Sequence, residues 1–111
     1  MGKFVITKRT SGEFQFNLIT ANNGKTVLSS EGYLIKLSCE NDIESVRKNS
    51  RDDSKYARKT LPNGNSYFNL QTASGQVIVT SEMYESTGER DNGIDFVKTK
   101  APNAIIEDTT I

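Results

Sequence analysis

The sequence contains no histidine and only one cysteine, Cys39. Without histidine, the chain lacks the commonest general base and the commonest metal ligand of proteins. A single cysteine excludes a disulfide within the chain and a zinc site built from several thiolates. Gly-rich phosphate loops, the Walker pattern and the dinucleotide fingerprint do not occur either. We therefore expect no metal site, no cofactor and no catalytic residues.

Apolar residues are scarce: 34% of the 111 residues are hydrophobic and 25% are charged. Such a composition supports only a thin core, which favours an economical sheet architecture or weak self-association. No stretch approaches the ~20 apolar residues of a membrane-spanning helix, and residues 1–8 do not resemble a signal peptide. The expected location is the cytoplasm, where a lone cysteine stays reduced.

Charge of one sign is not in excess, because 14 basic residues balance 14 acidic residues. This balance argues against binding nucleic acid through bulk charge. Basic side chains nevertheless gather around the middle of the chain: Arg47, Lys48, Arg51, Lys55, Arg58 and Lys59. They form either a patch for nucleic acid or an acidic partner, or a solvated helix end and a lysine-protected edge strand. The second interpretation is favoured.

The strongest signal in the sequence is an internal repeat. Phe16-Asn17-Leu18 matches Phe68-Asn69-Leu70 at a shift of 52, and Ser30-Glu31-x-Tyr33 matches Ser81-Glu82-x-Tyr84 at a shift of 51. Collinear identities of this kind indicate a duplicated structural unit. The sequence thus predicts a single compact domain over residues 1–111, with repeat one at 1–52 and repeat two at 53–111.

Each repeat is predicted to form three strands and then a helix. Alternating apolar and polar residues indicate half-buried strands, and the predicted strands are 4–7, 14–18 and 26–29, then 56–59, 67–71 and 77–80, with a closing strand at 104–107. In repeat one, Ile35, Cys39, Ile43 and Val46 share one helical face. In repeat two, Ser86 and Glu89 fit a capping box, and Gly88 and Gly93 each weaken the helix by about 1 kcal/mol.

One three-strand meander with one helix cannot bury enough apolar area alone. The predicted fold class is therefore α+β: two tandem β-β-β-α(-β) repeats that share one antiparallel sheet, with two helices packed on one face.

Several motifs resemble the YegP-like family of small bacterial proteins, which contain one or two copies of a domain of unknown function. They are Gly-Lys-Phe-Val-Ile near the start, Phe-x-Phe-Asn-Leu, Ser-Glu-Gly-Tyr and Cys-Glu-Asn-x-Ile-Glu-Ser-Val-Arg-Lys-Asn. The resemblance implies two units in one sheet, with the strand after each helix pairing into the other unit, and it implies no established activity. One departure is Leu34-Ile35-Lys36-Leu37 in place of a small polar helix start. The first helix is expected to begin at Ser38 or to expose two leucines.

The repeated Ser-Glu-x-Tyr motif supplies the main candidate site. Its members are Ser30, Glu31, Tyr33, Ser81, Glu82 and Tyr84. At the strand-to-helix junctions they would line a shared polar ligand groove. In the favoured structural alternative, the serine caps the turn, the glutamate accepts from backbone donors, and the tyrosine packs under the helix.

Three further features have structural interpretations. Asn41 and Asn92, which lie mid-helix against their propensity, are predicted to hydrogen-bond a neighbouring strand or loop. Cys39 is predicted to be a small buried hydrophobic residue. The acidic runs Asp52-Asp53 and Glu40-x-Asp42-x-Glu44 lack the spacing of a calcium loop.

The sequence thus favours a non-enzymatic binding or interaction module. A structural or self-associating stress-type protein is the alternative, and an enzyme that uses glutamate and tyrosine is a third hypothesis.

Overall fold

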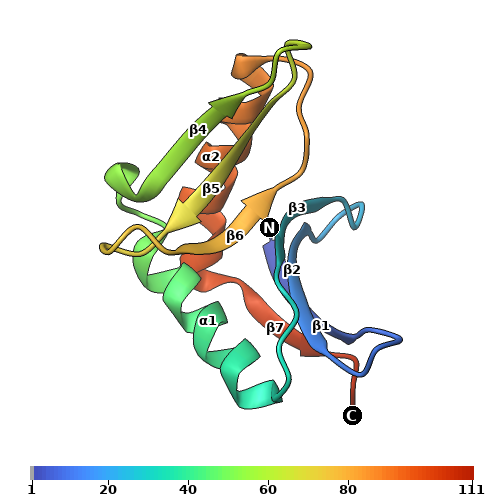
Figure 1. The fold of residues 1–111 in the computed structure, drawn as a ribbon. Helices are drawn as coiled ribbons and strands as arrows, with labels where there is room; N and C mark the ends of the chain where they lie inside the picture. The colour runs from blue at the N-terminus through green and yellow to red at the C-terminus, as the bar shows by residue number, and fades with distance from the viewer. Residues whose placement is uncertain (1) are drawn as a thin grey trace.

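The computed structural model describes residues 2–111 and shows one sheet that carries both repeats (Figure 1). Repeat one forms β1 (Gly2–Lys8), β2 (Phe14–Thr20), β3 (Thr26–Ser30) and α1 (Lys36–Asn49). Repeat two forms β4 (Tyr56–Thr60), β5 (Ser66–Gln71), β6 (Val77–Ser81), α2 (Thr87–Lys100) and β7 (Ile105–Asp108). Short 3-10 helices, Asp53–Lys55 and Ala101–Asn103, follow α1 and α2. The predicted α+β class and the element order are confirmed.

The seven strands are ordered β4-β5-β6-β3-β2-β1-β7. At the centre, β3 pairs antiparallel with β6, and Ser29 lies opposite Thr80. The repeats therefore meet through equivalent strands. As the family resemblance implied, the strand after the second helix joins the other repeat, because β7 pairs with β1.

The pairing of β1 with β7 is parallel, which differs from the fully antiparallel sheet that the sequence predicted. A two-residue hairpin can join only antiparallel neighbours. No hairpin joins β1 to β7, because almost the whole chain lies between them. The direction of β7 is set instead by where α2 ends, because β7 starts from that point. The sheet is therefore mixed, with parallel and antiparallel pairs.

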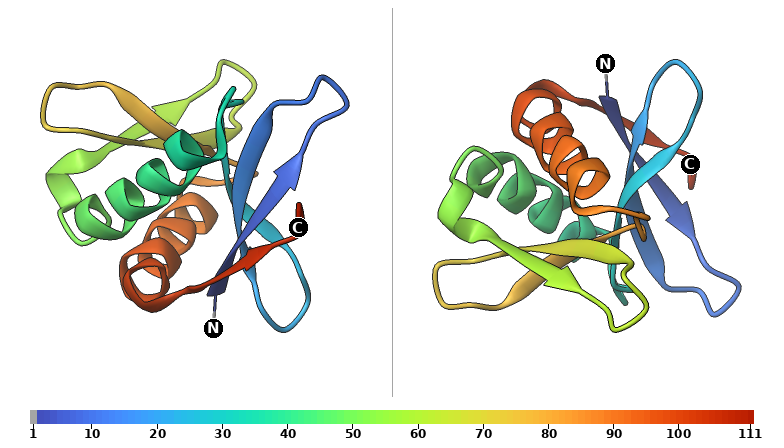
Figure 2. Two further views of the ribbon diagram at one scale, coloured as in Figure 1. Left: turned by 90° about the horizontal axis from the view of Figure 1, so that it is seen from below. Right: turned by 90° about the horizontal axis from the view of Figure 1, so that it is seen from above.

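Both helices lie side by side on the concave face of the curved sheet (Figure 2). Alternate strand residues face them, as the two-residue period of a strand requires. The fully buried large side chains are Phe4, Ile6, Phe16, Leu18, Leu28, Phe68, Leu70 and Val79 from the sheet, and Ile43, Val46, Ile94 and Val97 from the helices. Cys39 is also fully buried, as predicted, and burial raises the pKa of its thiol to about 11.

The start of α1 corrects one prediction and confirms another. Ile35 does not belong to the buried stripe, because it is the N-cap, has extended backbone (φ −126°, ψ 143°) and is 59% exposed. A side chain before the first helical turn does not follow the helical period. The helix begins at Lys36 rather than Ser38, and Leu34 and Leu37 are 84% and 62% exposed.

The prediction for Asn41 and Asn92 is wrong. Both residues are exposed, and neither side chain forms a hydrogen bond within residues 2–111. The faces of α1 and α2 that meet the sheet carry Cys39, Ile43 and Val97, so the asparagines lie on faces turned toward solvent.

Two carboxylates tie distant elements together. Asp108 accepts from Lys36 at 2.8 Å and so joins β7 to the start of α1. Asp53 accepts from Lys98 and from Arg58, which joins α2 and β4 to the 3-10 helix Asp53–Lys55. Hydrogen bonds from these cations hold the pKa of both carboxyls at about 2, below the ordinary 3.8.

We therefore expect the free energy of unfolding to fall as pH decreases from the ordinary pKa of 3.8 through about 2. A carboxyl with a lowered folded-state pKa stabilises the fold above its unfolded value and loses that contribution as it is protonated. When urea unfolding is measured across this pH range, the free energy of unfolding of Asp53→Asn should fall less steeply with decreasing pH than that of wild type. Asp95→Asn is the control, because Asp95 forms no ion pair within residues 2–111. Equal slopes for wild type and Asp53→Asn would contradict this expectation.

Candidate functional site

The two serines of the repeated motif are bound to the sheet. Each hydroxyl accepts from the backbone amide of the adjacent strand, Phe16 at 3.0 Å for Ser30 and Phe68 at 2.9 Å for Ser81. Each also donates to the carbonyl of the following glutamate at 2.8 Å. These buried hydroxyls thus satisfy backbone groups where the strand pairing ends.

The two glutamates of the motif, Glu31 and Glu82, are exposed. Within residues 2–111, neither carboxylate forms an ion pair or a side-chain hydrogen bond. The backbone amide of Glu82 donates to the carbonyl of Val27 at 3.2 Å, which links the two repeats. The two glutamates thus add one backbone hydrogen bond between the repeats and two solvent-exposed negative charges.

Tyr33, the tyrosine of the motif in repeat one, is packed on the sheet and hydrogen-bonded to α1. Its ring stacks on Phe16, with ring centroids 6.3 Å apart and planes inclined by 12°. Its hydroxyl donates to Asp42 on α1 at 2.6 Å. Burial, and then the hydrogen bond to Asp42, raise the pKa of Tyr33 far above its ordinary value. The phenol is therefore held neutral and fully engaged by the helix above it.

Tyr84 repeats the packing of Tyr33 without its hydrogen bond. Its ring stacks on Phe68 with centroids 6.4 Å apart and an inclination of 8°. The position that corresponds to Asp42 is Gly93, at the shift of 51. A Cβ atom at Gly93 would lie 2.5 Å from the Tyr84 hydroxyl oxygen, so the phenol occupies the space of the missing side chain. Burial raises the pKa of Tyr84, with the nearby charge of Glu82 adding to it.

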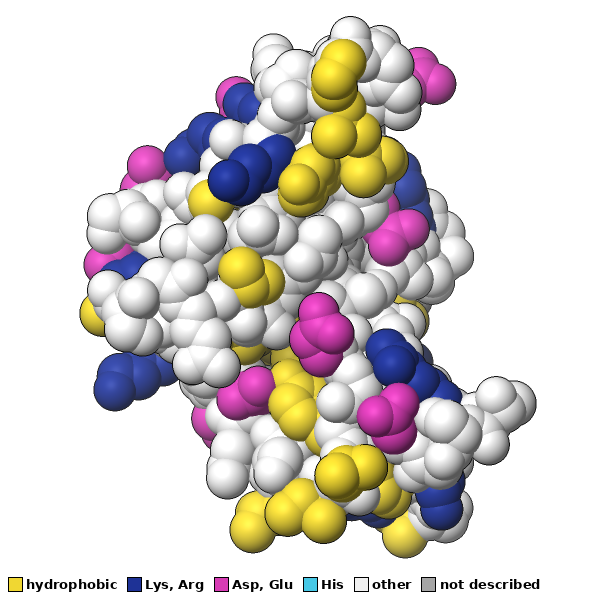
Figure 3. All heavy atoms as spheres, viewed as in Figure 1, with side chains coloured by type: hydrophobic (Ala, Val, Ile, Leu, Met, Phe, Trp, Pro, Cys, Tyr) yellow, Lys and Arg dark blue, Asp and Glu magenta, His cyan; other side chains and the backbone are white. Residues whose placement is uncertain are grey.

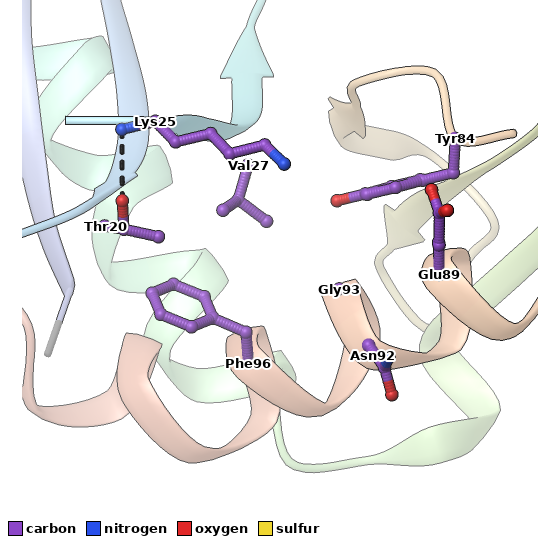
Figure 4. A pocket seen from close by; sticks show the side chains of 8 residues that line it. All are labelled: Thr20, Lys25, Val27, Tyr84, Glu89, Asn92, Gly93 and Phe96. Carbon is purple, nitrogen blue, oxygen red and sulfur yellow. Dashed lines mark hydrogen bonds between the residues drawn. The ribbon is translucent and has the colours of Figure 1, made fainter. Parts of the chain in front are cut away.

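A pocket of about 450 Å³ opens beside the Tyr84 hydroxyl, between α2 and the β2–β3 hairpin of repeat one (Figure 4). Its lining residues are Thr20, Lys25, Val27, Tyr84, Glu89, Asn92, Gly93 and Phe96. We call it the Tyr84 pocket. In Figure 4 the Lys25 ammonium and the Tyr84 hydroxyl point toward one another across it, while the Asn92 side chain points away.

Of the six motif residues, only Tyr84 lines this pocket. The structure does not bring Tyr33 and Tyr84 into one groove, because each is covered by the helix of its own repeat. The other lining residues were missed because the sequence comparison looked for identities. The pocket lies where the copies differ: Gly93, Phe96 and Glu89 replace Asp42, Ser45 and Ser38, and Lys25 corresponds to Gln76. A search for differences between the repeats would have found these four, but not Thr20 and Asn92, which are identical to Thr72 and Asn41.

The basic side chains around the middle of the chain divide into two sets. Arg47, Lys55 and Arg58 each pair with a carboxylate, and Arg47 also donates to the carbonyl of Ala104. Lys48, Arg51 and Lys59 are exposed and form no ion pair within residues 2–111. Half of the predicted patch is thus already neutralised by neighbouring acids, which leaves three free cations on the surface.

Across residues 2–111, no cluster of three or more histidine, cysteine, aspartate or glutamate side chains is arranged to hold a metal ion. In the same part of the chain, no helix combines the length and apolar character needed to cross a membrane.

The asymmetry between the tyrosines predicts different effects for the same substitution. Tyr33→Phe should lower the free energy of unfolding by about 1–2 kcal/mol, because a half-buried hydrogen bond to a carboxylate is lost. Tyr84→Phe should leave it within about 0.5 kcal/mol of wild type, because its hydroxyl has no partner among residues 2–111. Urea denaturation of both variants makes the comparison. If Tyr33→Phe and Tyr84→Phe lowered the free energy of unfolding equally, the Tyr84 hydroxyl would be hydrogen-bonded in solution.

The fold and the pocket define a class of protein: a duplicated α+β domain with a mixed sheet, two helices on one face and an open pocket between helix and sheet. The sequence matches the family "Domain of unknown function (DUF1508)" twice, at residues 10–56 and 62–108. It is 47% identical over 103 residues to the UPF0339 protein in the ptx operon 5' region of Stutzerimonas stutzeri, covering 93% of this chain and 92% of that protein. It is 40% identical over 109 residues to the UPF0339 protein YegP of Escherichia coli K12, covering 98% of both.

Solved structures agree with these matches. The solution NMR structure of a UPF0339 protein from Shewanella oneidensis superposes with a TM-score of 0.89 at 41% identity, covering 96% of this chain and 90% of that one. The NMR structure of YegP from E. coli gives the same TM-score and identity, covering 97% and 92%. The chain belongs to the UPF0339 family of tandem DUF1508 proteins, and the resemblance to YegP-like proteins is confirmed. The names of these relatives state no activity.

Proposed function

We propose that this protein is a non-enzymatic binding module that holds a small molecule in the Tyr84 pocket. The observation that supports this proposal is the difference between the repeats. In repeat one the tyrosine hydroxyl is bonded to Asp42, whereas in repeat two the same hydroxyl has no partner among residues 2–111 and faces a pocket of about 450 Å³. A volume of this size lies in the ordinary range for ligand pockets.

The open arrangement lacks a contact that the closed arrangement makes, which favours a functional interpretation. The hydroxyl of Tyr33 donates to Asp42, and a hydrogen bond to a charged group stabilises a fold by more than a neutral one. At the corresponding position Gly93 supplies no such acceptor, so the Tyr84 hydroxyl faces the pocket. Local departures from the stabilising pattern are typical of functional sites.

Binding rather than turnover is supported by a chain without histidine, the side chain that most often transfers protons near neutral pH. The proposal places the protein in the cytoplasm, which the free thiol of Cys39 supports.

The proposal is tested with Gly93→Asp, which gives repeat two the side chain of repeat one and offers the Tyr84 hydroxyl the partner that Tyr33 has. Small molecules released by denaturing the purified protein are identified by mass spectrometry. We expect a compound that wild type retains and Gly93→Asp loses. Gly88→Asp is the matched control, because Gly88 lies on the same helix with open space around its missing Cβ.

NMR spectra of each variant establish that it is folded, and Lys25→Met replaces Gly93→Asp if that variant is not. Identical small-molecule contents in wild type and the pocket variant, or a wild type that retains nothing, would contradict the proposal.

Self-association is the second candidate function. Leu34, Ile35 and Leu37 are exposed together at the start of α1, and Figure 3 shows hydrophobic side chains gathered over that lower end of the molecule. Contiguous exposed apolar side chains are typical of contact surfaces. Sedimentation velocity over a wide concentration range should then show a dimer that Leu34→Ser and Leu37→Ser together remove. A monomer at all concentrations would exclude this candidate.

A further inference from the structure

We infer that the ligand of the Tyr84 pocket is a small monocarboxylate with an apolar, ring-containing body. This inference rests on the proposed function and adds the chemical class of the ligand. It is drawn from the donors, the apolar walls and the single acidic group that surround the cavity.

Two unpaired donors face the same space. The Lys25 ammonium and the Tyr84 hydroxyl point toward one another in Figure 4, and neither has a hydrogen-bond partner within residues 2–111. A lysine ammonium only donates, and a phenol donates readily to an anion. An anionic oxygen placed between them would accept from both, and hydrogen bonds of this charged kind are the stronger ones.

The third hydroxyl in the lining, that of Thr20, is already engaged. It donates to Asn23 and accepts from the backbone amide of Lys25 at 3.0 Å. These contacts fix the hairpin that carries Lys25. Lys25 and Tyr84 are therefore the donors that would bind a polar group of the ligand.

The walls of the pocket are apolar. Val27 is buried on the sheet side, the ring of the half-buried Phe96 lies on the α2 side (Figure 4), and Gly93 presents bare backbone between Phe96 and Tyr84. Ligand sites typically combine such apolar walls with a few placed polar groups. The flat Phe96 ring is suited to an apolar ring on the ligand, because aromatic pairs gain attraction beyond their buried area.

Glu89 limits the charge of the ligand. Its carboxylate stands beside Tyr84 at the same pocket (Figure 4), and it forms no ion pair within residues 2–111. A second negative charge on the ligand would be repelled by this group, whereas one negative charge is matched by Lys25. The pocket therefore favours a monocarboxylate over a phosphate ester.

The test is an NMR titration of the full chain with three matched probes: 3-phenylpropionate, its neutral amide 3-phenylpropionamide, and phenyl phosphate. We expect 3-phenylpropionate to shift the backbone amide signals of Lys25 and Gly93 with a Kd of about 4 mM or tighter, as the lower range of ligand efficiency allows. The amide and the phosphate should each bind at least about tenfold more weakly, since each lacks the single matched charge.

A variant pair assigns the carboxylate contact. Lys25→Met keeps an unbranched side chain of nearly the same length and removes its charge, so it should weaken the binding of 3-phenylpropionate about tenfold and leave that of the amide unchanged. Lys48→Met is the control, because Lys48 is an exposed lysine of α1 without an ion pair in the described residues, and it should change neither affinity.

The outcomes separate this inference from the proposed function. Equal affinities for acid, amide and phosphate would overturn the carboxylate assignment while supporting the pocket as a binding site. An unchanged affinity for 3-phenylpropionate in Lys25→Met would also overturn it. If no probe shifts the pocket signals, the inference is wrong, and a compound that co-purifies with wild type but not with Gly93→Asp would still support the proposed function.

Discussion

Replacing Phe68 with alanine is expected to lower the free energy of unfolding by about 3–5 kcal/mol, the usual loss for a buried phenylalanine. Phe68 is fully buried in β5. Its ring lies 5.7 Å from that of Tyr56 and stacks with Tyr84 at 6.4 Å. The alanine variant loses the buried area and leaves a cavity behind the tyrosine that lines the pocket. Urea denaturation at neutral pH measures the loss.

Phe96→Ala is the comparison for this substitution. Phe96 is only half-buried and borders the pocket, so its removal exposes less new surface and leaves a gap that is open to solvent. The expected loss is about 1–2 kcal/mol, in proportion to the smaller area removed from water. A loss at Phe68 no larger than the loss at Phe96 would contradict the packing described for β5.

Gly93→Ala is expected to lower the free energy of unfolding by up to about 2 kcal/mol, although alanine is the better helix former. The added Cβ would lie 2.5 Å from the Tyr84 oxygen and 2.9 Å from its Cζ atom. Overpacking of this kind is typically unfavourable by about 1–3 kcal/mol, which exceeds the gain in helix propensity of about 1 kcal/mol. Thermal and urea unfolding should both show the loss.

The same substitution at Gly88 should have the opposite sign. The nearest atom to a Cβ there is the Ser86 hydroxyl at 3.9 Å, so Gly88→Ala should stabilise the protein by up to about 1 kcal/mol. In a Tyr84→Ala background the clash at Gly93 disappears, and Gly93→Ala should then become neutral or stabilising. A stabilising Gly93→Ala in the wild-type background would show that Tyr84 does not pack against α2.

Features that depend on local spacing could be predicted from the sequence. The alternation in Phe14–Leu18 places Phe16 and Leu18 in the core, because neighbouring side chains of a strand face opposite sides. Ser86 accepts from the amide of Glu89 at 3.1 Å, as the predicted cap requires. The internal repeat predicted that one sheet carries both copies, since neither copy has enough apolar area alone.

Features that depend on which surfaces meet could not be predicted. Arg90 lies in the apolar stripe of α2 at the position of Cys39 and is only 8% exposed. Its Nε atom donates to Asp91 at 3.2 Å. Residue type alone assigns an arginine to the surface, because a buried charge is unfavourable unless it is paired. The depth of burial, and the contact of the Arg90 guanidinium with the carbonyl of Lys59 on β4, exist only once α2 is docked on the sheet.

The sequence by itself determined the duplicated architecture, because strand alternation, helical period and turn chemistry are properties of neighbouring residues. Only the tertiary structure decided the direction of β7 and the position of the pocket. The pairing of β3 with β6 places the hairpin that carries Lys25 opposite the helix that carries Gly93. Nothing in the spacing of these residues predicts that a missing side chain at Gly93 faces the hydroxyl of Tyr84, because that contact is made by packing between segments of the chain.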